Sequence, residues 1–170
     1  MSQTYADRPT LAAWNALEAG ASKLVKLAEF TLTTAARTYE INAAQLSLAD
    51  HTAALLLVEL PTDAGKVDFI VNGLTSGYKQ LAVNGGSTNS EQYFVLVGWS
   101  GGLTVFRQRP YDSVAHCICY AFSNGANYFN TSHYSLPIGL SAIETLTVRG
   151  DVGSVTMPAG TRIVLYGVTL

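Results

Sequence analysis

Residues 161–169 form the stretch that most limits the folds open to this chain. The stretch alternates with a period of two, is rich in β-branched residues, and follows a turn that contains Pro158 and Gly160. Both faces of the expected strand carry apolar side chains, as Val164 and Leu165 illustrate. A terminal strand frays unless a sheet holds it. The sequence therefore predicts that this strand lies inside a sheet, between strands formed earlier in the chain, and closes the fold.

From Lys23 onward the chain consists of apolar runs separated by turns, without the helices that would connect parallel strands. A Ser-Gly-Gly turn at residues 100–102 predicts a hairpin between the runs on either side of it. We interpret the chain as all-β, a jelly-roll-like antiparallel β-sandwich of about eight strands. The predicted strands lie at residues 24–32, 37–42, 52–60, 67–72, 93–99, 103–108, 113–122, 142–149 and 161–169, with a short one at 154–157.

The first 22 residues have a different character from the rest of the chain. Leu11, Trp14 and Leu17 follow one another at helical spacing. A helix of about three turns is marginal alone in water, so its apolar edge needs a partner. The segment either folds back on the β-domain or serves as an arm that docks on another protein. The chain thus divides into a docking arm or helix at 1–22 and a β-sandwich domain at 23–170.

The composition describes a single domain of low charge. Only 13% of the 170 residues are charged, against about 25% in typical proteins, whereas 48% are hydrophobic. A surface so poor in charge suits packing against other subunits, and we expect a homotrimer. The net charge is −2 and Lys and Arg form no cluster, which argues against a nucleic-acid partner. The sequence contains no apolar run long enough to span a membrane.

Cys117 and Cys119 occupy alternate positions of one predicted strand, so both side chains point to the same face. Small residues share that face, whereas His116 lies on the opposite one. Free cysteine is a common small buried residue. We therefore predict a reduced pair in the core, with no metal site and no cofactor.

Two long segments, 73–92 and 123–136, are predicted to be loops. The second mixes rigid aromatic side chains with adaptable polar ones, which is typical of recognition loops and would suit a sugar. The aromatic residues could instead plug the open end of the sandwich or contact a neighbouring subunit. The candidate ligand or receptor residues in this segment are Asn127, Tyr128, Phe129, Asn130, His133 and Tyr134.

Catalytic signals are weak, and we expect a protein that is not an enzyme. The three histidines, His51, His116 and His133, lie in different segments. The Gly-x-Ser-x-Gly motif of the hydrolases and the Gly-rich phosphate-binding motif are both missing from the sequence.

The C-terminal stretch contains a recognisable run of residues: Ala159, Gly160, Thr161, Arg162, Leu165, Tyr166 and Gly167. With these residues it resembles a recurring module of tailed-bacteriophage virion proteins: tail fibres, tail-tip proteins, head fibres and capsid decorations. The strand predicted at 143–149 resembles the preceding strand of that module.

This resemblance implies a trimer, a helical N-terminal arm that docks on capsid or tail proteins, and a place in the virion after assembly in the host bacterial cytoplasm. Two functions follow as expectations. The first is a structural subunit of the particle, and the alternative is a carbohydrate-binding module that recognises a glycan on the host surface.

Overall fold

The computed structural model describes residues 23–46, 48–61, 66–83, 86–98, 101–109, 111–121, 130–150 and 156–169. The predicted docking arm at 1–22, with Leu11, Trp14 and Leu17, lies outside these residues, as do Asn127, Tyr128 and Phe129. The described part is an all-β structure of two antiparallel sheets, as the sequence predicts. No helix within it is long and apolar enough to cross a membrane.

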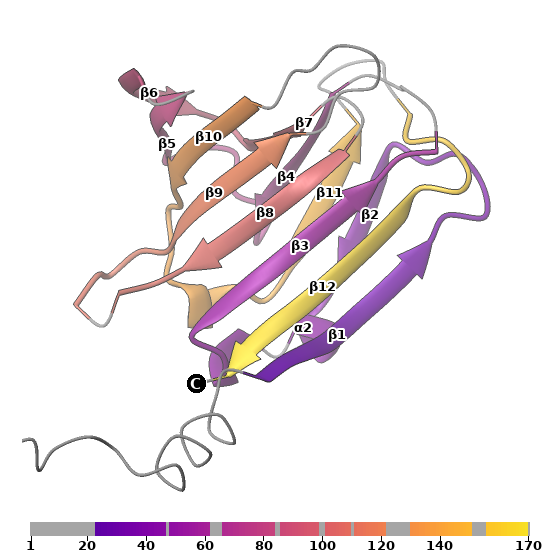
Figure 1. The fold of residues 1–170 in the computed structure, drawn as a ribbon, viewed down its shortest axis with the longest axis horizontal. Helices are drawn as coiled ribbons and strands as arrows, with labels where there is room; N and C mark the ends of the chain where they lie inside the picture. The colour runs from indigo at the N-terminus through magenta and orange to yellow at the C-terminus, as the bar shows by residue number, and fades with distance from the viewer. Residues whose placement is uncertain are drawn as a thin grey trace, which may run out of the picture.

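The larger sheet has eight strands, and the smaller one lies behind it in Figure 1. The larger sheet contains, in spatial order, β1 (Lys23–Thr31), β12 (Arg162–Thr169), β3 (Ala53–Glu59), β8 (Gly101–Arg107), β9 (His116–Ala121), β10 (Asn130–Ser135), β5 (Tyr78–Val83) and β6 (Gly86–Gln92). The smaller sheet contains, in the same way, β2 (Thr38–Ile41), β11 (Leu146–Gly150), β4 (Val67–Val71) and β7 (Val95–Gly98). Short helical turns are α2 (Ala43–Leu46), η1 (Leu48–Asp50) and η2 (Leu140–Ala142).

Strand β12 lies inside the larger sheet, between β1 and β3 (Figure 1). Arg162 faces Thr31 of β1 on one side and Glu59 of β3 on the other. Ile163, Val164 and Leu165 are all fully buried. The prediction that this strand sits between earlier strands is therefore confirmed.

The core lies between the two sheets, where alternate residues of each strand meet. Phe69 of β4 packs against Phe106 of β8 with ring centroids 5.3 Å apart, which joins the smaller sheet to the larger one. Tyr78 is also fully buried, and its hydroxyl accepts a hydrogen bond from the Val71 N–H and donates one to the Leu74 carbonyl oxygen. These two bonds satisfy the polar end of a large buried side chain.

The prediction of a hairpin around residues 100–102 is wrong. Strand β7 belongs to the smaller sheet, whereas β8 belongs to the larger one, so the chain changes sheets at this point. Gly101 has φ of +104°, and a Cβ there would lie 2.1 Å from the carbonyl oxygen of Val58. A Cβ at Gly102 would lie 2.6 Å from the carbonyl oxygen of Val97. The two glycines allow the close backbone approach that the change of sheets requires.

The two predicted long loops also contain strands. Residues 78–83 and 86–92 form β5 and β6, and residues 130–135 form β10. The sequences of β6 and β10 are polar, so neither shows the apolar alternation by which strands are recognised. Their pairing with neighbouring strands, which is a tertiary effect, decides their structure. Part of the short strand predicted at 154–157 is described, and there Met157 forms a single bridge with Ala36.

Candidate functional site

The side of the larger sheet that faces away from the core, called the outer face below, is apolar over the neighbouring strands β12, β3, β8 and β9, with Leu24 of β1 at its edge. In the middle of this face, Leu55 of β3 lies between Tyr166 of β12 and Val105 of β8, and Val105 faces Ile118 of β9. These side chains are half-buried because they shield one another. The outer face contains Leu24, Ala53, Leu55, Leu57, Leu103, Val105, Ile118, Tyr120, Val164, Tyr166 and Val168.

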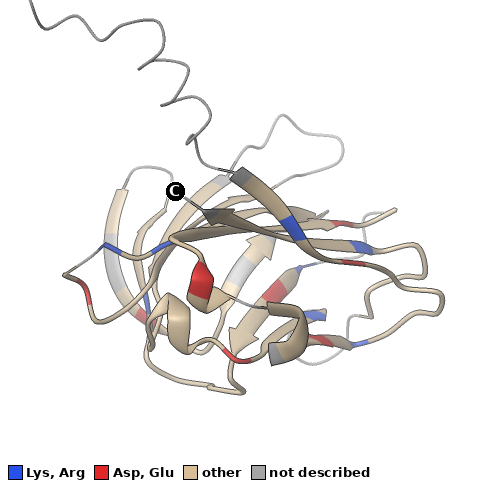
Figure 2. Cartoon of the chain, turned by 90° about the horizontal axis from the view of Figure 1, so that it is seen from below, with Lys and Arg blue, Asp and Glu red and all other residues tan. Residues whose placement is uncertain are grey.

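The size of the outer face sets it apart from scattered apolar side chains. Four strands about 4.8 Å apart, each with about five residues at about 3.4 Å per residue, give this face a footprint of roughly 300 Å². Contiguous apolar patches on the surface of a monomer are often functional. At its edge, Leu24 of β1 is 58% exposed. Charged residues are sparse across the described strands (Figure 2).

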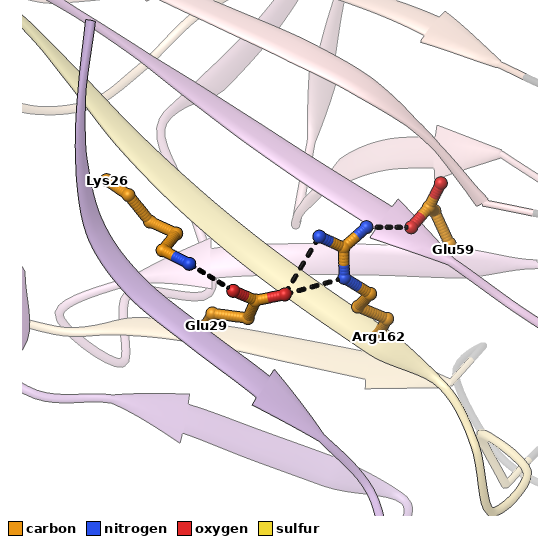
Figure 3. A network of polar contacts seen from close by, with 4 residues as sticks. All are labelled: Lys26, Glu29, Glu59 and Arg162. Carbon is orange, nitrogen blue, oxygen red and sulfur yellow. Dashed lines mark hydrogen bonds and ion pairs between the residues drawn. The ribbon is translucent and has the colours of Figure 1, made fainter.

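One end of the outer face carries a network of charged side chains (Figure 3). Arg162 of β12 bonds Glu29 of β1 through Nε at 2.8 Å and Glu59 of β3 through Nη1 at 2.7 Å. Lys26 donates a further hydrogen bond to Glu29. The bonds from Lys26 and Arg162 hold the pKa of the Glu29 carboxyl below its usual value. Arg162, one of the residues of the virion-protein resemblance, thus connects three strands.

A surface hollow of about 630 Å³ lies over β8, β9, β10 and β5, and is the candidate ligand site. Binding sites for small molecules commonly measure roughly 300–1,000 Å³. Its polar lining is Arg107, Arg109, Asp112, His116, His133 and Tyr134. Its apolar lining is Leu81, Val105, Cys117 and Ile118.

Strand register explains why residues from separate segments meet at the hollow. Arg107, the last residue of β8, faces His116, the first residue of β9. In the next row Val105 faces Ile118, which in turn faces His133 of β10. All five positions alternate with core residues, so their side chains share the outer side of the sheet.

The connection between β8 and β9 supplies Arg109 and Asp112. Gln108 fixes this connection, because its Nε2 donates to the Asp112 carbonyl oxygen and its Oε1 accepts from the Leu140 N–H, both at 2.6 Å. The Asp112 carboxylate lies 3.5 Å from Nε2 of His116. The polar wall of the hollow is therefore tied to η2 rather than being a free loop.

The structure divides the residues predicted for the recognition loop. His133 and Tyr134 both line the hollow, but Tyr134 is only 2% exposed, and its hydroxyl accepts a hydrogen bond from Gln80 at 3.0 Å. His133 therefore offers the exposed side chain of this pair. Asn130 begins β10, and its side chain is not described.

Arg107, Arg109, Asp112 and His116 were missed as candidate residues. His116 and His133 had been assigned to separate segments, and the structure brings them to one hollow. Alternation along β8 and β9 places Arg107 and His116 on the outer side, which is the signal that could have identified them. The sequence predicts a loop at residues 130–135, so it does not predict the pairing of β9 with β10.

Cys117 and Cys119 are both free and buried, as predicted. Burial, and then the hydrogen bond with Cys119, raise the pKa of the Cys117 thiol well above its usual value. The Thr104 hydroxyl donates to the Cys119 sulfur at 3.3 Å. Among the described residues, no three His, Cys, Asp or Glu side chains are grouped in a way that could hold a metal ion.

Comparison with known proteins identifies no relative, because no family model, curated protein or solved structure matches the chain. The resemblance to virion proteins therefore stays a prediction.

Proposed function

We propose that the protein is a non-enzymatic structural subunit of a tailed-phage particle. It belongs either to the head, as a capsid decoration or head fibre, or to the tail, as a tail-fibre subunit. The observation that carries this proposal is the apolar outer face of the larger sheet. A subunit that assembles with others has a use for such a face, whereas a monomer has to keep it in water. The C-terminal stretch resembles tailed-bacteriophage virion proteins, and for this reason we propose that the assembly is a virion.

The proposed fold is a jelly roll, and the strand order supports it. Without β5, β6, β9 and β10, the strands form two four-stranded sheets with the orders β1-β12-β3-β8 and β2-β11-β4-β7. The first strand then pairs with the last and the second with the last but one, as in two interleaved Greek keys. The remaining strands form two hairpins, β5–β6 and β9–β10, which extend the larger sheet. Jelly rolls occur in viral capsid proteins and in lectins.

The proposed occupant of the outer face, outside the hollow, is a second copy of the same chain within a homotrimer. The charged network at the end of this face contains both signs, with Lys26 and Arg162 beside Glu29 and Glu59. In a cyclic trimer this face meets a different surface of the next copy. An end that carries both signs can pair with either sign on that surface. Residues 1–22 would then remain available to dock on capsid or tail proteins.

Light scattering after size exclusion tests the homotrimer. The full chain should elute at about three times its mass of 18.1 kDa. Leu55→Lys places a charge in the middle of the outer face and should give a folded monomer. Thr38→Lys adds the same charge at an exposed position of β2 and should leave the trimer intact. A wild-type chain that is monomeric at micromolar concentration would contradict self-association through this face.

The virion proposal needs a separate measurement. Purified particles should contain the protein in a fixed ratio to the major capsid or tail protein, as determined by quantitative mass spectrometry. Absence from the particles would refute the virion assignment, even if the protein is a trimer.

Glycan recognition is the second candidate function, and the hollow favours it. This site has a volume suited to a small molecule, an apolar floor and a polar wall held in place by Gln108. Binding of a glycan by the isolated protein would support this function independently of any place in a particle.

A further inference from the structure

We infer that the hollow binds an acidic sugar, with the carboxylate of the sugar held by Arg107 and Arg109. This inference rests on the second proposed function, glycan recognition, and gives it a definite chemistry. It does not require the protein to be part of a virion.

The first observation concerns the ion pairs formed by the arginine side chains. Arg149 and Arg162 are each paired with a carboxylate at 2.6–2.8 Å. Arg107 and Arg109 line the hollow, and neither forms an ion pair or a side-chain hydrogen bond with another residue of the described part of the chain. Two guanidinium groups at one site, both free to take an anion, form a suitable receptor for a carboxylate.

The second observation is the arrangement around these arginines. His116 faces Arg107 across β8 and β9, and Ser135 faces His116 across β9 and β10. His133 is therefore a diagonal neighbour of His116, at a backbone separation of roughly 7–8 Å. Both imidazoles can donate a hydrogen bond to a hydroxyl or a carboxylate, whether neutral or charged.

The floor of the hollow suits the body of the ligand. Val105 and Ile118 face each other across β8 and β9 and are half-buried. Adjacent apolar side chains of this kind can pack against the C–H face of a sugar ring, while the arginines meet its acidic group. The volume of about 630 Å³ has room for more than the carboxylate alone.

The fixed charges of the hollow match a ligand with one negative charge. The Asp112 carboxylate also lines the hollow, and Gln108 ties the backbone of Asp112 in place. Asp112 offsets one of the two arginines, so the single carboxylate of a sugar balances the remaining positive charge. The net charge of −2 gives the protein no general attraction for polyanions.

The test is titration of the full chain with glucuronate and with glucose, followed by NMR chemical-shift changes. These sugars differ only in the carboxylate, so the pair isolates its contribution. Glucuronate should shift the resonances of Arg107, His116 and His133 in the millimolar range, and glucose should bind much more weakly. Inorganic phosphate serves as a second anion and should not displace glucuronate at equal concentration.

Matched variants assign the effect to the hollow. Arg107→Gln and Arg109→Gln should each lower the affinity for glucuronate roughly tenfold, because each removes a charge-assisted hydrogen bond. Arg37→Gln removes the same charge from an exposed position outside the hollow and should change nothing. All three positions are exposed, so the variants should fold normally, and their melting temperatures check this.

Several outcomes would overturn the inference. These are no response to glucuronate, equal binding of glucose, displacement by phosphate, or an equal loss of affinity in Arg37→Gln. If glucose binds and neither Arg107→Gln nor Arg109→Gln weakens its binding, glycan recognition would stand. The proposed site and its carboxylate chemistry would then be rejected. Failure of all sugars would reject glycan recognition as well.

Discussion

Asp68 of β4 and Arg149 of β11 face each other across the smaller sheet and form an ion pair, with Arg149 Nε 2.6 Å from Asp68 Oδ1. Asp68 is 1% exposed, and the Arg149 guanidinium lies over the ring of Phe94, 5.9 Å from its centroid. Removal of one partner leaves a charge buried without its counter-ion. The pair is thus a point at which a single substitution should have a large effect.

Arg149→Leu should therefore lower the free energy of unfolding by about 3–5 kcal/mol, since it removes the counter-ion of the buried Asp68 carboxylate. Urea denaturation followed by tryptophan fluorescence measures this change. Glu40→Gln removes a charge from an exposed position of the neighbouring strand β2 and should cost less than about 0.5 kcal/mol. Similar stabilities of the two variants would show that the pair contributes little.

The change of sheets at Gly101 leads to a second prediction. Gly101→Ala should destabilise the fold by more than about 3 kcal/mol, because it adds both a strained φ and a backbone collision with β3. Gly73→Ala is the matched control, since Gly73 also has a positive φ of +65° but nothing lies within 4 Å of its added Cβ. This control should cost only about 1–2 kcal/mol. Equal losses in thermal melts would mean that the close approach to Val58 is unimportant.

The buried cysteines should be chemically inert in the folded protein. A thiol reagent attacks the thiolate, which both burial and the raised pKa of Cys117 suppress at neutral pH. Maleimide labelling should therefore be slow in buffer and complete in denaturant, and reductant should not change the melting temperature. Rapid labelling of the folded chain would show that the strand carrying both residues opens readily.

The raised pKa of the Cys117 thiol also predicts how the stability of the fold changes with pH. The thiol in the unfolded chain titrates near pH 8.5, below its pKa in the folded state. The protonated thiol is compatible with burial, so stability should fall as the pH rises above about 8.5. Cys117→Ala should reduce this alkaline loss. Identical pH profiles for the wild-type chain and the variant would assign the loss to other groups.

The docking-arm proposal predicts separate effects on stability and assembly. Deletion of residues 1–22 should leave the melting temperature of the β-domain nearly unchanged but abolish incorporation into particles. Trp14→Ala should produce much of that defect, because a buried aromatic anchor is commonly worth on the order of 2 kcal/mol. A truncated chain that unfolds early yet still binds particles would contradict the arm and favour a helix folded on its own sheet.

The strands with strong alternation were predictable from the sequence, and the polar ones were not. The run at 161–169 has β-branched and apolar side chains on both faces, so the pattern predicts that it lies inside a sheet. Its neighbours, β1 and β3, are seen only in the structure. Strand β10 has the sequence NTSHYS, which reads as a loop because only its pairing with β9 and β5 makes it a strand. Local sequence does not contain that information.

The candidate site was predictable only in part for the same reason. His133 was identified from the composition of its segment, but its neighbours Arg107 and His116 reach it through two strand pairings. The wrong prediction of a hairpin at Gly101 has a related cause. Two glycines between apolar runs suit a tight turn and a change of sheets equally well, so the sequence does not distinguish the two.

The position of β12 has a consequence for how the protein is made. Strand β12 lies between β1 and β3 in the larger sheet, so these two strands do not pair with each other. In the chain, β12 follows both of them. Until residues 162–169 leave the ribosome, both strands have a hydrogen-bonding edge without its native partner. The larger sheet therefore cannot be completed before β12 has been synthesised, and its completion needs contacts between residues far apart in sequence, which form slowly. A chain that stops short of β12 would expose those two edges and aggregate.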